Sequence, residues 1–179
     1  MNKIGLNNLK KIIWKIRYLR NPVEYARKKG VKIGAGNSFV DHPNFGSEPY
    51  LITIGDYNRI SFECAFVTHD GGRWVLDHLY PEDKPFLKFG KIEIGNNNFF
   101  GARVIVNPGI RIGDNCVIAA GSIVTKDIPS GEVLGGVPAK RLMSIDEYKE
   151  KLINNKNIFD LNEFEKNRRN ELIRVLMEK

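Results

Sequence analysis

Aliphatic or aromatic residues recur every six positions through the middle of this chain of 179 residues. The unbroken run consists of Ile94, Phe100, Val106, Ile112, Ile118 and Val124. A second block in the same register consists of Ile54, Ile60 and Phe66, and a weaker block begins at Ile33 and Phe39. A period of six matches neither a helix, which repeats at about 3.6 residues, nor a strand, which alternates at about 2. It matches a coil of triangular section, in which each side is one short strand.

The residue after each anchor is mostly small, which suits a corner of such a coil. Gly95, Gly101 and Gly113 stand at this place, and glycine adopts backbone conformations that larger residues resist. Stacked coils bury a continuous apolar interior, as other solenoids do. The repeat therefore predicts a mainly β fold, a parallel β-helix over residues 31–142. The alternative is a chance pattern in a β protein rich in Ile and Val, which the unbroken run and the turn residues in phase with it argue against.

Two segments interrupt the repeat. Residues 41–51 break the first block, and residues 70–91 form an inserted loop that is too long for a coil corner. The insertion contains Trp74 and other aromatic and charged residues. Because long loops in compact domains are usually functional or disordered, we expect this one to be ordered and to cover something.

The N-terminal residues 1–30 predict a helical cap on the open end of the coil. One helix is expected over residues 6–20 and a second from Asn21-Pro22 to Gly30, since a cap residue followed by proline opens a helix and glycine ends one. Ten lysines and arginines lie in residues 1–32 against one acid, Glu24. We expect the first helix to pack as a cap, and weak association with an anionic membrane is the alternative. No nucleic-acid recognition motif accompanies the charge.

The C-terminal residues 143–179 also predict helices. Ser144 and Glu147 form a capping-box pattern that opens the first of them. Apolar residues at helical spacing predict one more helix between Leu161 and Leu176.

Hydrophobicity and cysteine content indicate a cytoplasmic protein. No apolar run approaches the ~18–20 residues that a membrane-spanning helix needs. The N-terminus has no apolar stretch followed by a cleavage site of small residues, as a signal peptide would. Cys64 and Cys116 fall at packing positions of the repeat, which predicts buried, reduced thiols. We expect the protein in the cytoplasm, at the inner membrane surface if the basic N-terminal segment binds lipid.

His69 is the first candidate for chemistry, because it leaves the repeat where the insertion begins. An imidazole, with an unperturbed pKa of about 6.5, suits proton abstraction from a hydroxyl or an amine at neutral pH. From position alone, a surface histidine without a role explains the residue equally well. A zinc site is the rival interpretation, since the other histidines are His42 and His78. Their separation along the chain argues against three converging ligands.

Small residues and cations gather near the end of the coils. Ala120-Gly121 and Gly135-Gly136 let a slender ligand lie against backbone N–H groups, and nearby cations can meet phosphates. The cations are Lys126, Lys140 and Arg141. Glycines that serve only the corners, with solvated cations beside them, are the alternative. The P-loop and dinucleotide-binding signatures are absent from the sequence.

Three segments resemble the hexapeptide-repeat acetyltransferases, a family that includes the maltose, galactoside and serine O-acetyltransferases and the xenobiotic acetyltransferases. The segments are residues 107–115 (NPGIRIGDN), 120–129 (AGSIVTKDIP) and 136–140 (GVPAK). The resemblance covers residues 31–142 and is most specific in its C-terminal half. Residues 45–52 and 66–74 most resemble the members that modify bacterial surface polysaccharides.

The resemblance implies a left-handed coil, a homotrimer, and acetyl-CoA as acyl donor in a groove between neighbouring subunits. It places the catalytic histidine of the family at His69. It places contacts to the pantetheine arm at Gly101, Ala102, Ala120 and Gly121. It places contacts near the CoA phosphates at Thr125, Lys126 and Lys140, with Arg141 as a further candidate. No metal is expected.

The implied reaction is O-acetylation of a hydroxyl on a sugar or polysaccharide precursor, by direct transfer with His69 as general base. Asp70 or Glu63 is expected to hold the tautomer of the imidazole. Sugar acetyltransferases often have an acceptor-binding asparagine where this chain has Glu63. Glu63, Trp74 and His42 are therefore candidates for binding the acceptor. The alternatives are N-acetylation of a nucleotide-linked amino sugar, a zinc-dependent hydratase on the same fold, and a scaffold without activity.

Overall fold

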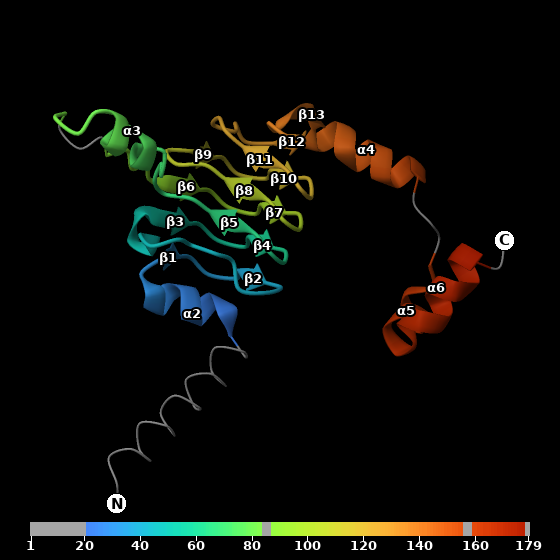
Figure 1. Ribbon diagram of the computed structural model, residues 1–179. Coiled ribbons are helices and arrows are strands. Elements are labelled where there is room, and N and C mark those ends of the chain that lie inside the picture. The colour runs from blue at the N-terminus through green and yellow to red at the C-terminus, as the bar shows by residue number, and fades with distance from the viewer. Residues whose placement is uncertain (1–20, 84–86, 156–158, 178–179) are drawn as a thin grey trace, which may run out of the picture. The chain divides into compact units, whose positions relative to one another are not determined.

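The computed structural model describes residues 21–83, 87–155 and 159–177 (Figure 1). The helix predicted over residues 6–20 lies outside the described residues. Contacts divide the chain into two compact units, with the division after Ile145. Among the described residues, no helix is both long enough and apolar enough to cross a bilayer.

Short strands stack into three sheets, which form the sides of a β-helix (Figure 1). In spatial order, sheet A contains β1 (Lys32–Ile33), β3 (Ile52–Ile54), β6 (Ile92–Ile94) and β9 (Arg111–Ile112). Sheet B contains β2 (Ser38–Phe39), β4 (Arg59–Ile60), β7 (Phe99–Phe100), β10 (Val117–Ile118), β12 (Glu132–Gly135) and β13 (Lys140–Ser144). Sheet C contains β5 (Ala65–Phe66), β8 (Ile105–Val106) and β11 (Ile123–Val124). These strands pair in parallel, except that β13 runs antiparallel to β12.

The anchors of the repeat fill the interior, which confirms the predicted period. The six anchors of the unbroken run, from Ile94 to Val124, are each at most 4% exposed. An aromatic column continues through the stacked coils. The ring of Phe66 lies 5.2 Å from that of Phe45 and 5.8 Å from that of Phe100, measured between centroids. The coil that carries His69 therefore rests on a packed core.

The corners are held by close backbone contacts and by a ladder of buried amides. A Cβ at Gly95 would lie 2.8 Å from the carbonyl oxygen of Gly113, so this corner has no room for a side chain. The Asn58 Oδ1 accepts from the Asn98 N–H at 3.0 Å, and the Asn98 Oδ1 accepts from the Cys116 N–H at 2.7 Å. Each amide thus joins one coil to the next and fixes the register of the stack.

Helix α2 (Pro22–Lys29) packs beside the first coil and agrees with the predicted start and stop signals. The Asn21 Oδ1 accepts from the Glu24 N–H at 3.0 Å, and Gly30 ends the helix at φ 111°. Ala26 is buried against the core together with Val31. The short 3-10 helix η1 (Pro49–Leu51) forms the end of the first interruption and leads into β3.

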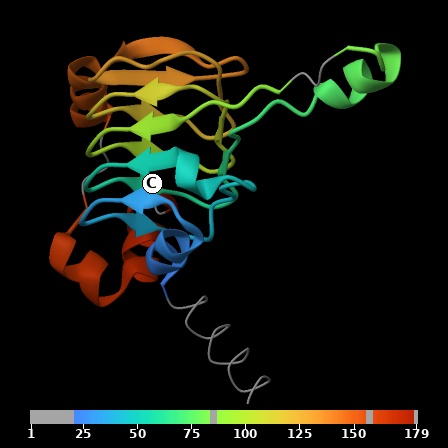
Figure 2. The same cartoon turned by 90° about the vertical axis from the view of Figure 1, so that its left-hand side faces the viewer.

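The insertion is ordered at its base and contains helix α3 (Arg73–Leu79). Its two stems pair where they leave the coil, since the Asp70 N–H donates to Lys88 O at 3.0 Å and the Gly90 N–H donates to Thr68 O at 2.8 Å. Figure 2 shows the insertion extending from the side of the coils. No residue of α3 is buried, and Trp74 is 73% exposed.

The second unit contains α4 (Ile145–Asn155) apart from its first residue, together with α5 (Leu161–Lys166) and α6 (Arg168–Met177). Helix α4 begins directly after Ser144, as the capping-box pattern predicts. The single helix predicted between Leu161 and Leu176 is wrong, because Asn167 leaves helical geometry at φ −147°, ψ 73° and divides it in two. The buried Glu171 joins α6 to the start of α5. Its carboxylate accepts from Arg174 and from the Asp160 N–H, and these bonds lower its pKa to about 2.

Candidate active site

His69 lies at the point where the chain leaves sheet C and enters the insertion. Strand β5 ends three residues earlier at Phe66, whose side chain is anchored in the core. His69 itself forms an antiparallel bridge with Phe89 on the returning stem. The rings of these two residues lie 5.8 Å apart between centroids. A rigid coil and the base of a loop therefore position the imidazole together.

The carboxylate that contacts this imidazole is Glu48. Its Oε2 lies 2.9 Å from the His69 Nδ1 and also accepts a hydrogen bond from the Thr68 hydroxyl at 2.7 Å. The Thr68 bond, and then the His69 bond, hold the pKa of Glu48 below its ordinary value. An ionised carboxylate only accepts hydrogen bonds, so Nδ1 carries a proton and the Nε2 of the neutral ring keeps its lone pair. This is the tautomer that a general base requires.

The first interruption of the repeat brings Glu48 to this place. The segment after residue 41 runs beside the coil of His69, with a bridge from Asn44 to Ala65 and a bond of 2.8 Å from the Phe66 N–H to Asn44 O. Gly46 then takes a left-handed conformation at φ 63°. Glu48 was not anticipated from the sequence, since it precedes His69 by 21 residues and no local pattern joins the two. The sequence feature that could have pointed to Glu48 was the interruption of the repeat at residues 41–51.

The two carboxylates expected beside the imidazole lie elsewhere. Asp70 accepts a hydrogen bond of 2.9 Å from the Gly72 N–H and so shapes the turn that opens α3. Glu63 pairs with Arg103 at 2.6 Å, and both side chains are largely exposed. Within the chain, the contact to the His69 Nδ1 therefore belongs to Glu48. The reason is topological, because Glu63 stands before β5 and His69 stands after it.

The other histidines and Trp74 have separate environments. His42 lies 3.2 Å from the Asp41 Oδ1 and packs edge-on against Tyr25. The Nδ1 of His78 contacts the Trp74 carbonyl oxygen at 2.6 Å on α3. In the part of the chain that the structure describes, no three His, Cys, Asp or Glu side chains are grouped as metal ligands. Acceptor contacts by His42 and Trp74 remain predictions.

The four small residues assigned to the pantetheine arm lie together at the corner between sheets B and C. The Gly121 N–H donates to Ala102 O at 2.8 Å, which stacks the two segments directly. A Cβ at Gly101 would lie 2.4 Å from the Ala120 nitrogen, so the stacking of these two coils leaves no room for a side chain at position 101. Gly121, at φ 72°, faces open space. The corner thus presents backbone and methyl groups to any ligand laid along it.

The residues assigned to the CoA phosphates also come together. Thr125, Lys126, Lys140 and Arg141 line one pocket of about 380 Å³, with Pro138 and Ala139 between the strands. Arg141 pairs with Glu132. Lys126 and Lys140 have no carboxylate partner among the described residues, so their ammonium groups are available to an anion.

Comparisons with known proteins identify the family of the chain. A family model described as the hexapeptide repeat of succinyl-transferase matches residues 91–126. Protein CapG of Staphylococcus aureus is 42% identical over 175 residues, which cover 90% of this chain and 100% of that protein. Galactoside O-acetyltransferase of Escherichia coli is 35% identical over 130 residues, which cover 73% of this chain and 62% of that protein.

Solved structures extend the likeness to the fold. A hexapeptide-repeat acetyltransferase from Vibrio cholerae, solved in complex with acetyl coenzyme A, superposes with a TM-score of 0.55 at 26% identity, covering 65% of this chain and 61% of that chain. A maltose O-acetyltransferase from Clostridium difficile superposes with a TM-score of 0.52 at 25% identity, covering 68% of this chain and 73% of that chain. The coil is a left-handed parallel β-helix. The chain is an acyltransferase and belongs to the family of hexapeptide-repeat acetyltransferases.

Proposed function

We propose that the protein transfers the acetyl group of acetyl-CoA directly to a hydroxyl of a sugar or polysaccharide precursor, with His69 as general base. The observation that carries this proposal is the hydrogen bond between the His69 Nδ1 and Glu48 at the mouth of the insertion. The likeness to galactoside and maltose O-acetyltransferases supports the class of acceptor. The likeness to a structure that holds acetyl coenzyme A supports the donor.

The reaction proceeds in one transfer. The His69 Nε2 takes the proton of the acceptor hydroxyl as its oxygen forms a bond to the thioester carbonyl carbon. The C–S bond then breaks, and the imidazolium returns the proton to the departing CoA sulfur. Glu48 holds the ring in the required tautomer and balances the positive charge that develops on it. Backbone N–H groups of a neighbouring coil stabilise the oxyanion, typically by a factor of about 10²–10³ for one donor.

An acyl-enzyme on cysteine does not fit this site. Burial raises the pKa of both the Cys64 and the Cys116 thiol, which disfavours the nucleophilic thiolate. The Cys64 Sγ already donates to the Gly101 carbonyl oxygen at 3.2 Å within the core. Direct transfer is therefore the mechanism that the side chains support.

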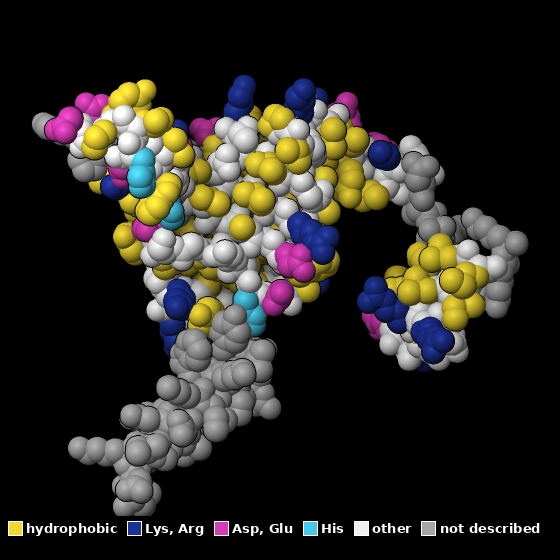
Figure 3. Space-filling model, in the orientation of Figure 1, with side chains coloured by type: hydrophobic (Ala, Val, Ile, Leu, Met, Phe, Trp, Pro, Cys, Tyr) yellow, Lys and Arg dark blue, Asp and Glu magenta, His cyan; other side chains and the backbone are white. Residues whose placement is uncertain are grey.

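We propose that the active form is a trimer with each site shared by two copies. His69 stands where the chain leaves sheet C, whereas the Ala102 and Ala120 corner stands where the chain enters it. One copy therefore presents these two features at opposite edges of sheet C. The partly exposed residues of this sheet are Ala65, Ile105 and Ile123, which form an apolar strip that suits packing between copies. Figure 3 shows hydrophobic side chains exposed at several places on the visible face of the coils.

Purified full-length protein, assayed for release of CoA thiol from acetyl-CoA, tests the activity. Sugars with free hydroxyls and nucleotide-linked amino sugars are compared as acceptors, and the product is analysed by mass spectrometry for ester or amide. His69→Ala should abolish turnover and leave the affinity for acetyl-CoA within about twofold, because the base contacts the acceptor. Rapid amide formation would replace the O-acetyl proposal with N-acetylation. Full activity of His69→Ala would refute the assigned base.

A further inference from the structure

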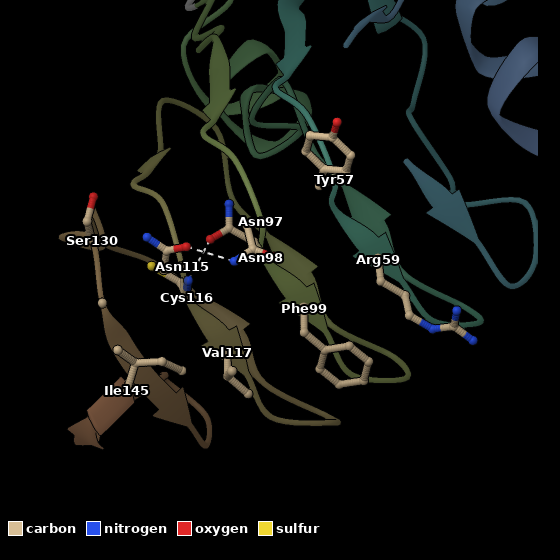
Figure 4. A pocket seen from close by; sticks show the side chains of 11 residues that line it. Tyr57, Arg59, Asn97, Asn98, Phe99, Asn115, Cys116, Val117, Ser130 and Ile145 are labelled. Atoms are coloured by element: carbon tan, nitrogen blue, oxygen red, sulfur yellow. Dashed lines mark hydrogen bonds between the residues drawn. The ribbon is translucent and has the colours of Figure 1, made fainter. Parts of the chain in front are cut away.

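A second groove lies on the outer face of sheet B, away from His69, which follows sheet C (Figure 4). Its volume is about 650 Å³, within the range of ~300–1000 Å³ that small-ligand clefts occupy. The groove is formed by the first unit alone and is bounded at one end by Ile145. The reaction proposed for His69 makes no use of it.

One wall of the groove is a polar ladder at the corner between sheets A and B. Tyr57, Asn97, Asn115 and Gly131 occupy equivalent left-handed positions on successive coils. Backbone bonds of 2.8 and 2.9 Å join Asn97 to Asp56 O and Asn115 to Asn96 O, and Gly131 continues the stack. With ~4.8 Å between neighbouring strands, three intervals give a ladder of about 14 Å. The groove is therefore linear and runs along the axis of the β-helix.

The other wall is formed by outward side chains of sheet B. Arg59, Phe99 and Val117 are in register on adjacent strands, and Figure 4 shows them projecting to the same side. Phe99 is 42% exposed and Tyr57 is 67% exposed. The core of the coil is filled from within by Phe100 and Ile118, so core packing does not account for the exposed ring of Phe99. The ring of Tyr57 covers Gly36 on the preceding coil, where an added Cβ would lie 2.4 Å from the ring.

Polar groups of the groove remain available to a ligand. The Asn97 Nδ2 donates to the Asn115 Oδ1 at 2.8 Å, which leaves the Asn115 amide hydrogens without a partner among the described residues. Arg59 contacts the Ser38 hydroxyl at 3.4 Å and has no carboxylate partner in the described part of the chain. The carboxylates at this corner are engaged, since Asp56 accepts from the Ala35 N–H and Asp114 from the Asn96 N–H. Neither carboxylate lines the groove, and the charged side chain in its lining is that of Arg59.

We propose that this groove binds a linear saccharide that carries carboxylate groups, such as a chain of uronic acids, separately from the catalytic site. Aromatic faces carry negative potential and attract the weakly positive C–H face of a sugar ring. Amide side chains donate to and accept from ring hydroxyls, and the planar guanidinium matches a carboxylate. A ladder with a regular repeat suits a polymer of similar units. The site holds the glycan chain on the enzyme and does not take part in acyl transfer.

Isothermal titration calorimetry of the full-length protein with a trimer of galacturonic acid tests the proposal, with a trimer of galactose as the neutral counterpart. Arg59→Ala should weaken binding of the acidic trimer by at least about tenfold, the factor expected for one charge-assisted hydrogen bond. Phe99→Ala should weaken both trimers. Arg111→Ala is the matched control, because it removes one exposed arginine from the outer face of sheet A.

Binding that is retained in His69→Ala and in Arg111→Ala, but reduced in Arg59→Ala and Phe99→Ala, supports the second site. Absence of binding to wild type overturns it, as does binding that is lost in His69→Ala or unchanged in Arg59→Ala. Equal affinity for the neutral trimer overturns the role of Arg59 in selecting carboxylates. The outcome is independent of acyl transfer, since the assay contains no acetyl-CoA.

Discussion

Replacing Glu48 by glutamine separates the charge of this residue from its shape. The amide oxygen of the introduced side chain can still accept from the His69 Nδ1 and from the Thr68 hydroxyl, which contact the native carboxylate at 2.9 and 2.7 Å. The variant therefore preserves the orientation of the ring. It removes the negative charge that faces the imidazolium during proton transfer.

The expected fall in kcat depends on how far solvent reaches the His69 and Glu48 side chains. A hydrogen bond to a charged group changes an equilibrium constant by a factor of about 10 more than a hydrogen bond between neutral groups does. In a buried catalytic triad, replacing the corresponding aspartate by asparagine lowers kcat by about 10⁴, because the imidazole then takes the wrong tautomer. Here 40% of the His69 side chain and 16% of the Glu48 side chain are exposed, so solvent screens the interaction. We expect kcat of Glu48→Gln to fall by roughly 10- to 100-fold, above the neutral-bond factor and well below that of the triad.

Steady-state kinetics with acetyl-CoA and the preferred acceptor, together with thermal unfolding, provide the measurement. The KM for acetyl-CoA and the unfolding temperature should remain near those of wild type. Glu93→Gln is a matched control, since it removes a carboxylate that pairs with Arg111 on sheet A. A kcat within twofold of wild type, or a loss explained by a lower unfolding temperature, would contradict the role of Glu48.

Other parts of the chain give further predictions. Phe100→Ala removes a fully buried ring and should lower the free energy of unfolding by about 3–5 kcal/mol, measured by denaturant titration. Gly101→Val introduces a Cβ only 2.4 Å from the Ala120 nitrogen, so we expect poor folding or lost affinity for acetyl-CoA. A variant that folds and binds acetyl-CoA like wild type would contradict the assigned packing. The folded-state pKa of Glu171 is lowered to about 2. The stabilisation of α5 and α6 by this carboxylate is therefore present above roughly pH 4.5 and is lost as the pH falls towards 2. Circular dichroism should show this loss of helix at acid pH in wild type and not in Glu171→Gln. Deletion of residues 1–20 should leave binding to anionic liposomes unchanged if this segment only caps the coil, and reduced binding would favour the membrane role.

The coil was predictable because apolar anchors recur at every sixth position of the sequence. Each anchor from Ile94 to Val124 is buried as the repeat requires, and the small residues after them stand at corners. The partners of His69 were not predictable in the same way. Hydrophobic periodicity reports which residues face the core, but Glu48 reaches His69 through the irregular segment that follows Asp41.

Charge pairing shows the same limit of sequence reasoning. Glu63 stands where sugar acetyltransferases often have an asparagine and was expected to orient the imidazole, yet it pairs with Arg103 on the next coil. In a solenoid, neighbours in space are separated by one coil length, and here Glu63 and Arg103 are 40 residues apart because the insertion intervenes. Asn167 illustrates a smaller failure, since an apolar pattern at helical spacing continued across a residue at which the backbone turns.

The antiparallel strand β13 has a consequence for how copies of this protein associate. A parallel β-helix whose last coil ended in open strands would present a template on which a second copy adds in the same direction. In this chain the backbone reverses after β12, and β13 occupies the free edge of sheet B with Lys140 and Arg141 on it. Helix α2 packs beside the opposite end of the stack. End-to-end growth into fibrils is thereby opposed at this edge, and association is directed to the sides of the prism, where closed rings of copies can form.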